Sequence, residues 1–203
     1  MNSSAFFSIG FSVVLGFTAW TAFSYLESTR DLPVYGNMVE DQPQSISEFI
    51  LLNEDSIAFN SSTFLGKPFI ANFFFASCPT VCPKMNGNFQ YLLNEYQSQI
   101  NGMSITVDPT SDTPSALSTY RKTRSFNNSN WKFLSGEKKM IYSLAIKEFM
   151  LVAAEIPADE IPFIHSDKIV LVDAEGYIRG YYSGLEESSI QDLHRDIKKL
   201  IKG

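Results

Sequence analysis

Two adjoining stretches decide the fold: residues 68–75, with the sequence PFIANFFF, and residues 76–83, with the sequence ASCPTVCP. The first stretch is a short, almost continuous apolar run rich in aromatic residues, which predicts a strand buried on both faces. Pro83 predicts that a helix begins near Cys82, because proline is tolerated in the first turn of a helix but costs about 3 kcal/mol in its interior. A buried strand therefore leads into a loop that carries two cysteines, and the loop leads into a helix.

The chain beyond this segment alternates between helical and strand patterns. Apolar spacing predicts helices at 83–99, 113–124, 137–150 and about 186–202. Further strands are predicted at 103–108, 131–134 (a short edge strand), 168–172 and 177–182, the last two forming a hairpin. Asp112 is expected to cap the helix at 113–124. A βαβ unit followed by a ββα unit predicts an α/β domain of thioredoxin-like fold, with a mixed central β-sheet flanked by helices.

The length and the composition limit the number of domains and the kinds of partner. A chain of 203 residues suits one domain plus a short extra segment. Hydrophobic residues make up 44% of the chain, which is enough for a packed core. The net charge of -6 comes without a basic patch, so the sequence argues against a nucleic-acid partner.

The amino-terminal segment differs in character from the rest of the chain. Residues 1–26 carry no charged side chain, and the apolar run at 5–26 is long enough to cross a membrane as one helix. A cleaved signal peptide would have a basic beginning and a small-residue cleavage site, and neither is evident. We therefore expect a membrane anchor at 1–26, a polar tether at 27–45 and one domain at 46–203.

Cys78 and Cys82 are the two cysteines of the chain, and they lie at the beginning of the predicted helix. The partial positive charge of a helix amino terminus stabilises a thiolate, which is the better nucleophile and the better metal ligand. Three residues separate the cysteines, whereas a redox dithiol usually has two. The longer loop can close a disulfide, or it can hold Cu(I), whose trigonal site an imidazole can complete. A passive disulfide or a pair of buried thiols is the alternative.

Two histidines are candidates for that imidazole. His194 falls on the polar face of the predicted helix at 186–202, where we expect it to be solvated. His165 directly precedes the predicted strand at 168–172, and in a thioredoxin-like sheet the loop that enters this strand lies against the cysteine loop. The cysteine spacing favours His165 as a metal ligand over an ordinary loop residue. For Asp108 and Asp112 we expect loop and cap roles, with a supporting role near the metal as the alternative.

Four motifs resemble those of the Sco/SenC family and follow the same order: FFFASCPTVCP at 73–83, SITVDPTSDTP at 104–114, WKFLSG at 131–136 and HSDKIVLVDAEG at 165–176. The resemblance implies a thioredoxin fold behind a single amino-terminal membrane anchor, with the domain in the periplasm or an equivalent space. It also implies binding of copper, as Cu(I) or Cu(II), by Cys78, Cys82 and His165. Thr80 departs from the acidic residue that many members have between the cysteines, which removes no ligand.

The function implied by the resemblance is assembly of the CuA centre of cytochrome c oxidase. The expected partners are the copper-accepting oxidase subunit, of the subunit II type, and a thiol reductant. The alternative is a membrane-tethered thiol–disulfide oxidoreductase in which Cys78 attacks and Cys82 resolves. Copper delivery requires no turnover of a small substrate, so this function does not make the protein an enzyme. Thiol–disulfide oxidoreductase activity stays the open alternative. A peroxidase is disfavoured, because no arginine lies between residues 31 and 120.

Overall fold

The computed structural model describes residues 17, 18, 20, 32–151 and 166–202. The chain divides into two compact units, Met1–Leu32 and Pro33–Gly203. In the first unit, Phe17, Thr18 and Trp20 are helical, and the other residues of the predicted membrane anchor lie outside the described residues. Within the described part of the chain, no helix combines the length and the apolar character needed to cross a bilayer.

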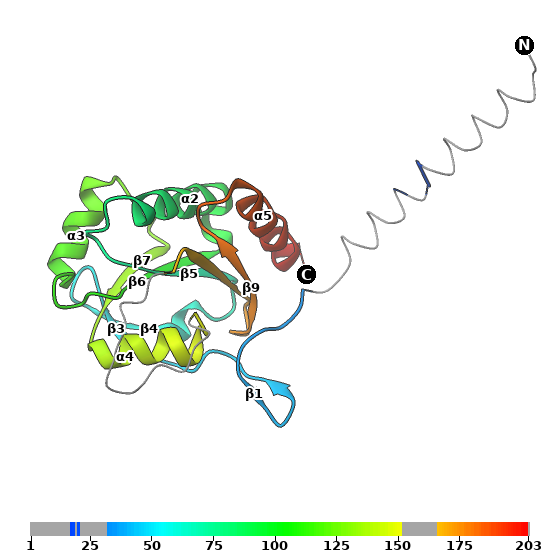
Figure 1. Cartoon of the computed structure of the whole chain (residues 1–203), viewed down its shortest axis with the longest axis horizontal. Helices are drawn as coiled ribbons and strands as arrows, with labels where there is room; N and C mark the ends of the chain where they lie inside the picture. Colours follow the sequence, from blue (N-terminus) through cyan, green and yellow to red (C-terminus); the bar gives the residue numbers. More distant parts are fainter. Residues whose placement is uncertain (1–16, 19, 21–31, 152–165, 203) are drawn as a thin grey trace, which may run out of the picture. The chain divides into compact units, whose positions relative to one another are not determined.

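A seven-stranded mixed sheet forms the centre of the second unit (Figure 1). Its strands are β3 (Ile50–Asn53), β4 (Ala58–Asn60), β5 (Phe69–Phe74), β6 (Asn101–Thr106), β7 (Trp131–Ser135), β8 (Lys168–Val172) and β9 (Ile178–Ser183). Their spatial order is β4–β3–β7–β6–β5–β8–β9. β5 is parallel to β6, and β6 is parallel to β7, whereas the other neighbouring pairs are antiparallel. All of β5 is buried, which confirms the predicted strand.

Helices cover both faces of this sheet. On one side lie α2 (Val81–Tyr96), α3 (Pro114–Thr123) and α5 (Glu187–Lys202), and on the other lie α4 (Lys138–Ser143) and the π-helical turn η3 (Leu144–Glu148) (Figure 1). Two short 3-10 turns, η1 (Ser61–Phe64) and η2 (Gln97–Gln99), complete the helical elements in the described part of the second unit. The observed order, βαβ followed by ββα, confirms the predicted α/β arrangement.

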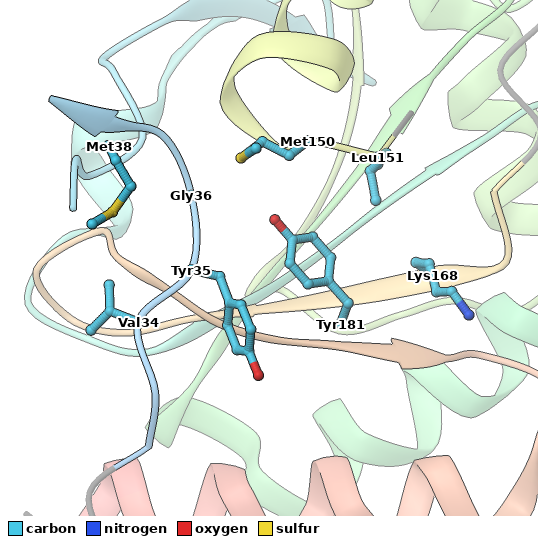
Figure 2. A pocket seen from close by; sticks show the side chains of 8 residues that line it. All are labelled: Val34, Tyr35, Gly36, Met38, Met150, Leu151, Lys168 and Tyr181. Carbon is cyan, nitrogen blue, oxygen red and sulfur yellow. The ribbon is translucent and has the colours of Figure 1, made fainter. Parts of the chain in front are cut away.

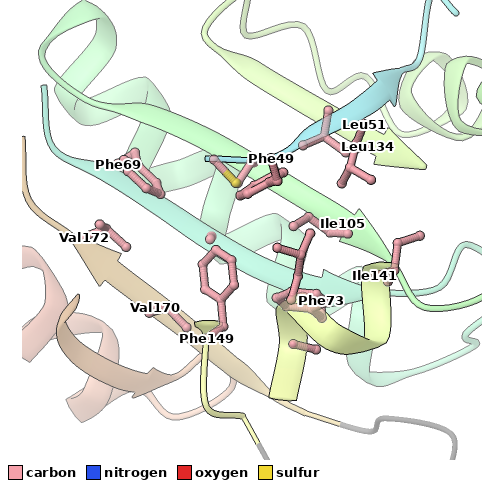
Figure 3. Packing of buried hydrophobic residues seen from close by; sticks show 14 of the residues in the cluster. Phe49, Leu51, Phe69, Phe73, Ile105, Leu134, Ile141, Phe149, Val170 and Val172 are labelled. Carbon is pink, nitrogen blue, oxygen red and sulfur yellow. The ribbon is translucent and has the colours of Figure 1, made fainter. Parts of the chain in front are cut away.

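The face of the sheet toward α4 carries a hydrophobic core cluster (Figure 3). Phe69, Ala71 and Phe73 alternate along β5 and all belong to this cluster, as the two-residue period of a strand requires. Phe73 meets Phe149 edge to face, with the ring centroids 5.3 Å apart. Burial of one such side chain contributes about 1.5–3 kcal/mol. The cluster therefore fixes the strand that leads into the cysteine loop.

The opposite face of β5 is held by a buried polar chain of three side chains. The Asn72 side-chain N–H donates to the Asn86 side-chain oxygen at 2.8 Å, and the Asn86 side-chain N–H donates to the Tyr120 hydroxyl at 3.2 Å. These residues lie on β5, α2 and α3 respectively. A buried hydrogen bond contributes about 1 kcal/mol, and leaving one of its partners unpaired costs more. The chain therefore fixes α2, which carries Cys82, on the sheet.

The amino-terminal part of the second unit differs from the prediction. Residues 46–67, to which the sequence patterns assigned no helix or strand, contribute β3 and β4, and β3 pairs with β7. β7 therefore lies between β3 and β6, and its prediction as an edge strand is wrong. The predicted tether also has regular structure, because β1 (Met38–Val39) pairs with β2 (Gln42–Pro43). Tyr35 forms a bridge to Ile178, so this segment lies along β9.

The predicted cap of α3 is also wrong. Thr113, and not Asp112, is the N-cap residue, and its hydroxyl accepts the N–H of Ala116 at 3.3 Å. Pro114 follows as the first helical residue, which suits a position whose N–H would be unpaired. The Asp112 carboxylate is thereby free for another role, described below.

A buried ion pair between Arg121 and Glu54 yields a prediction about stability. The side chain of Glu54 is 2% exposed, and it accepts from the Arg121 guanidinium and from the Phe133 N–H. Replacing Arg121 with alanine leaves a buried carboxylate without its cation, which should lower the free energy of unfolding by about 3–5 kcal/mol. Chemical denaturation measures this loss. Asp192→Ala is the control: its partner Arg195 is 60% exposed, so the loss should stay below about 1 kcal/mol. If both variants lost the same free energy of unfolding, the interpretation of Arg121 and Glu54 as a buried ion pair would be wrong.

Candidate functional site

Cys78 and Cys82 lie between the carboxyl end of β5 and the first turn of α2. Helix α2 begins at Val81, so Cys82 is its second residue and Pro83 its third. Pro83 thus occupies the first turn, where it breaks no helical hydrogen bond. Both cysteines are free thiols and both are buried, with exposed fractions of 7% and 5%. The Cys82 N–H donates to the Cys78 sulfur at 3.4 Å, so the start of the helix points a backbone donor at that thiol.

The two thiols differ in acidity. Burial raises the pKa of Cys78, but hydrogen bonds from the backbone N–H groups of Cys82, Thr80 and Val81 and from the Cys82 thiol outweigh it, and the net pKa lies below the ordinary value. Burial raises the pKa of Cys82 to about 12, and the neighbouring Cys78 and Asp112 add to the increase, against a hydrogen bond from the Phe75 backbone. The site therefore pairs one thiol that ionises readily with one that keeps its proton at neutral pH.

Asp112 holds the loop that approaches the cysteines. Its carboxylate is buried, and it accepts the Ala76 N–H at 2.9 Å and the Thr106 hydroxyl at 2.6 Å. Its backbone oxygen accepts the Ser135 hydroxyl at 2.8 Å. The carboxyl ends of β5, β6 and β7 are thereby joined through one side chain and its own backbone. Asp112 thus supports the cysteine loop directly, and the sequence pattern did not identify its partner Thr106.

A cavity of about 460 Å³ opens beside the cysteines. The residues that line it are Phe73, Phe74, Phe75, Cys78, Pro79, Thr80, Val81, Cys82, Ser166, Asp167 and Leu185. The lining is largely apolar, with the two thiols and one carboxylate as its reactive groups. It joins the cysteine loop to Ser166 and Asp167, the two residues that precede β8.

His165, the predicted third ligand, lies outside the described residues. Its neighbour Ser166 lines the cavity together with both cysteines. Within the ranges that the structure describes, no three histidine, cysteine, aspartate or glutamate side chains are close enough together to hold a metal ion. The predicted ligand set therefore stays a prediction.

His194, which we expected to be solvated, is half-buried instead. The Tyr96 hydroxyl and the His194 Nδ1 are 2.9 Å apart, and the rings meet with centroids at 5.2 Å. Burial lowers the pKa of His194, and nearby Lys198 lowers it further. His194 joins α5 to α2 and does not line the cysteine cavity. Its prediction as a solvated side chain is wrong, because Tyr96 covers this part of the polar face.

A second cavity, of about 500 Å³, lies beside β8 and β9 (Figure 2). The residues that line it are Val34, Tyr35, Gly36, Met38, Met150, Leu151, Lys168 and Tyr181. Lys168 directly follows Asp167 of the cysteine cavity, so the beginning of β8 lies between the two cavities. Neither thiol lines this second cavity, and it contributes nothing to the candidate site.

An α/β domain with two thiols at the start of a helix, at the carboxyl end of a central strand, defines a thioredoxin-like dithiol protein. The chain belongs to the SCO1/SenC family, whose model matches residues 38–202. A SCO2-like protein of Rickettsia conorii is 31% identical over 180 residues, which cover 83% of this chain and 85% of the relative.

Solved structures agree with this family assignment. BsSco, a member of the Sco family of cytochrome c oxidase assembly proteins with a disulfide switch, is 25% identical, with a TM-score of 0.67 over 85% of this chain and 96% of that chain. ScoI of Bradyrhizobium japonicum, solved with copper bound, is 22% identical, with a TM-score of 0.58 over 77% of this chain and 99% of that chain. The second likeness shows the fold alone, and both support the thioredoxin-like arrangement.

Proposed function

We propose that this protein binds copper through Cys78, Cys82 and His165 and delivers it to the CuA site of a cytochrome c oxidase. The carrying observation is that both cysteines and Ser166 line one cavity. The Cα atom of residue 165 lies about 3.8 Å from that of residue 166 by covalent geometry. The proposal therefore rests on His165 being bonded directly to a residue that shares this cavity with both thiols.

The chemistry of these donors fits copper as a cargo. Thiolate sulfur is a soft ligand that selects Cu(I), and a neutral imidazole suits copper in either oxidation state. Metal binding requires deprotonated ligands, so the thiol proton of Cys82 must leave when copper enters. Transfer moves the ion alone: ligands of the oxidase subunit replace the three ligands of this chain one at a time.

The partners and the location follow from the same proposal. The acceptor is the copper-binding oxidase subunit of the subunit II type, and a thiol reductant keeps the pair of cysteines reduced. The predicted anchor at 1–26 would hold the domain at the outer side of the membrane, in the periplasm or an equivalent space. BsSco, a member of a family of cytochrome c oxidase assembly proteins, supports the oxidase partner by analogy.

A second function, thiol–disulfide exchange, is favoured by the unequal acidity of the two thiols. The Cys78 thiolate would attack a disulfide of the partner and form a mixed disulfide, and one partner sulfur would leave as a thiolate. Cys82, after losing its proton, would then attack Cys78 and release the partner as a dithiol. The two electrons of the Cys78–Cys82 pair pass to the partner, and the same step removes two copper ligands.

Copper titration of the full chain in detergent micelles tests the proposal. The reduced protein should bind one Cu(I) ion per chain, because the three ligands form a single site. Oxidation of Cys78 and Cys82 to a disulfide should abolish tight binding, because thiolate ligands are then absent. Competition with a chromophoric Cu(I) chelator gives the affinity. Equal binding by the reduced and the oxidised protein would show that the thiols are not ligands.

A further inference from the structure

Asp112 carries a buried carboxylate to which neither copper binding nor thiol–disulfide exchange, as proposed above, assigns a chemical step. The residue is only 3% exposed. None of the ion pairs among the described residues includes it, so its charge is buried without a cation. A charge in such a place is unfavourable for folding unless hydrogen bonds compensate for the lost water. The hydrogen bonds of this carboxylate therefore indicate what it does.

The sheet fixes the position of Asp112. Its carboxylate accepts the Thr106 hydroxyl at 2.6 Å, and its backbone oxygen accepts the Ser135 hydroxyl at 2.8 Å. Its N–H donates to the Asp108 oxygen at 2.8 Å. The Thr106 hydroxyl in turn accepts the Asp108 N–H at 3.0 Å. Since Thr106 ends β6 and Ser135 ends β7, the carboxylate is anchored to two strands that do not carry the cysteines.

Two consecutive residues connect this anchored carboxylate to the cysteines. The Ala76 N–H donates to the Asp112 carboxylate at 2.9 Å. The N–H of the preceding residue, Phe75, donates to the Cys82 sulfur. The Phe75 oxygen accepts the Cys78 N–H at 3.2 Å. The segment of residues 75 and 76 thus contacts both cysteines on one side and the carboxylate on the other, so its position affects where both sulfurs lie.

The two sulfurs are already in contact in the structure. The Cys82 thiol donates to the Cys78 sulfur, and the Cys82 N–H donates to the same sulfur at 3.4 Å. A pair of thiols that is held in this way closes a disulfide, or binds one metal ion, with little further loss of conformational freedom. Loosening the segment that holds the pair should therefore disfavour both reactions.

We propose that Asp112 is the positioning residue of the thiol pair: through residues 75 and 76 it holds Cys82 against Cys78, as copper binding and disulfide formation both require. The inference deepens the proposed copper function, and its copper readout rests on that function. A hydrogen bond to a charged group corresponds to about tenfold or more in an equilibrium constant. Groups that orient metal ligands change metal affinity by about 10- to 100-fold when they are replaced.

Replacing Asp112 with alanine should therefore weaken Cu(I) binding about tenfold. The equilibrium constant for formation of the Cys78–Cys82 disulfide should also fall about tenfold, which corresponds to a reduction potential about 30 mV less negative. Asp112→Asn separates hydrogen bonding from charge, because it keeps an oxygen for the Ala76 N–H and the Thr106 hydroxyl. It should restore most of both losses.

The experiment measures both equilibria on the full chain in detergent micelles. Competition with a chromophoric Cu(I) chelator gives the copper affinity, and equilibration with glutathione gives the disulfide equilibrium. In the second reaction two glutathione thiols reduce the protein disulfide to the dithiol and become one glutathione disulfide, so that two electrons and two protons pass to the protein. Each Asp112 variant is compared with the wild type in both measurements.

Asp173→Ala is the matched control. Asp173 is also buried, and its carboxylate accepts the N–H groups of Glu175 and Tyr177. It directly follows β8, at the opposite end of that strand from the residues that line the cysteine cavity. Its replacement should lower stability but leave the copper affinity and the disulfide equilibrium at their wild-type values.

Each result has a distinct meaning. If Asp112→Ala and Asp173→Ala shift both equilibria equally, the effect is a general loosening, and the positioning role is overturned. It is also overturned if Asp112→Ala leaves the disulfide equilibrium unchanged, or if Asp112→Asn restores nothing. A wild type that binds no Cu(I) would overturn the copper function, whereas the disulfide equilibrium would still decide the role of Asp112. Should Asp112→Ala fail to fold, Thr106→Val takes its place, since it removes the hydroxyl that the carboxylate accepts.

Discussion

Replacing His165 with alanine should weaken Cu(I) binding by more than about 100-fold, because a lost ligand costs more than a lost supporting contact. The two thiolates would still hold Cu(I) in a linear site, so binding should weaken without vanishing. The affinity for Cu(II) should fall by a larger factor than the affinity for Cu(I), because two sulfurs alone do not satisfy the geometry that Cu(II) prefers. Thiol–disulfide exchange should continue at nearly the wild-type rate, because neither sulfur is removed.

The matched control for this prediction is His194→Ala. His194 is the other histidine of the chain, and it contacts Tyr96 on α2 instead of the cysteine cavity. Its replacement should leave copper affinity unchanged, although thermal stability should fall slightly through the lost contact. Competition with a chromophoric Cu(I) chelator measures the copper affinity of both variants. Equal copper affinities for His165→Ala and the wild type would remove the imidazole from the site.

Alkylation at neutral pH should modify Cys78 about 50-fold faster than Cys82. The pKa of Cys78 lies below 9.0 and that of Cys82 is about 12. Near pH 7 the thiolate fraction of Cys78 is thus at least about a thousandfold higher than that of Cys82. The Cys78 thiolate is the less nucleophilic of the two, because its pKa is lower, and this reduces its rate advantage by a factor of about 20. Access does not reverse the order, because the two side chains are similarly buried, at 7% and 5% exposed.

The two thiols should also differ in how their alkylation rates depend on pH. The rate for Cys78 should rise about tenfold per pH unit while the thiol is mostly protonated, and it should bend toward a plateau at a lower pH than for an ordinary thiol, because the pKa of Cys78 is lowered. Cys82 should show no plateau in that range. Mass spectrometry of iodoacetamide-treated protein at timed intervals resolves the two sites. In the Cys82→Ser variant, Cys78 should still react quickly, whereas Cys78→Ser should leave only the slow reaction. If both cysteines were modified at the same rate, the proposed difference in acidity between the two thiols would be wrong.

Local patterns predicted the centre of the fold well. The apolar run at 68–75 became β5, and the strand predicted at 168–172 has the bounds of β8. These segments are strongly patterned because they are buried in the middle of the sheet. The hairpin of β3 and β4 was not predicted, since its strands are short and each has an exposed face. Without that hairpin, β7 appeared to be an edge strand.

The site was predictable only as far as its chemistry is local in sequence. Cys78 and Cys82 were identified because their spacing and Pro83 are visible in one stretch. Asp112 was predicted as a cap, because the sequence does not reveal that its carboxylate reaches Ala76, thirty-six residues earlier. Asp167 gave no signal for the same reason, since its partner Ser183 lies on the next strand. Contacts of this kind depend on the folded arrangement and not on the motif.

The burial of both sulfurs has a consequence for how copper leaves the protein. With 7% and 5% of their surface exposed, Cys78 and Cys82 lie recessed in the cavity wall. A flat protein surface cannot approach them closely, so the receiving ligands have to arrive on a narrow, protruding loop. Bulky free chelators would be kept at a distance by the same walls. We therefore expect the shape of this recess to limit accidental loss of the ion and to favour release to a partner whose ligands project.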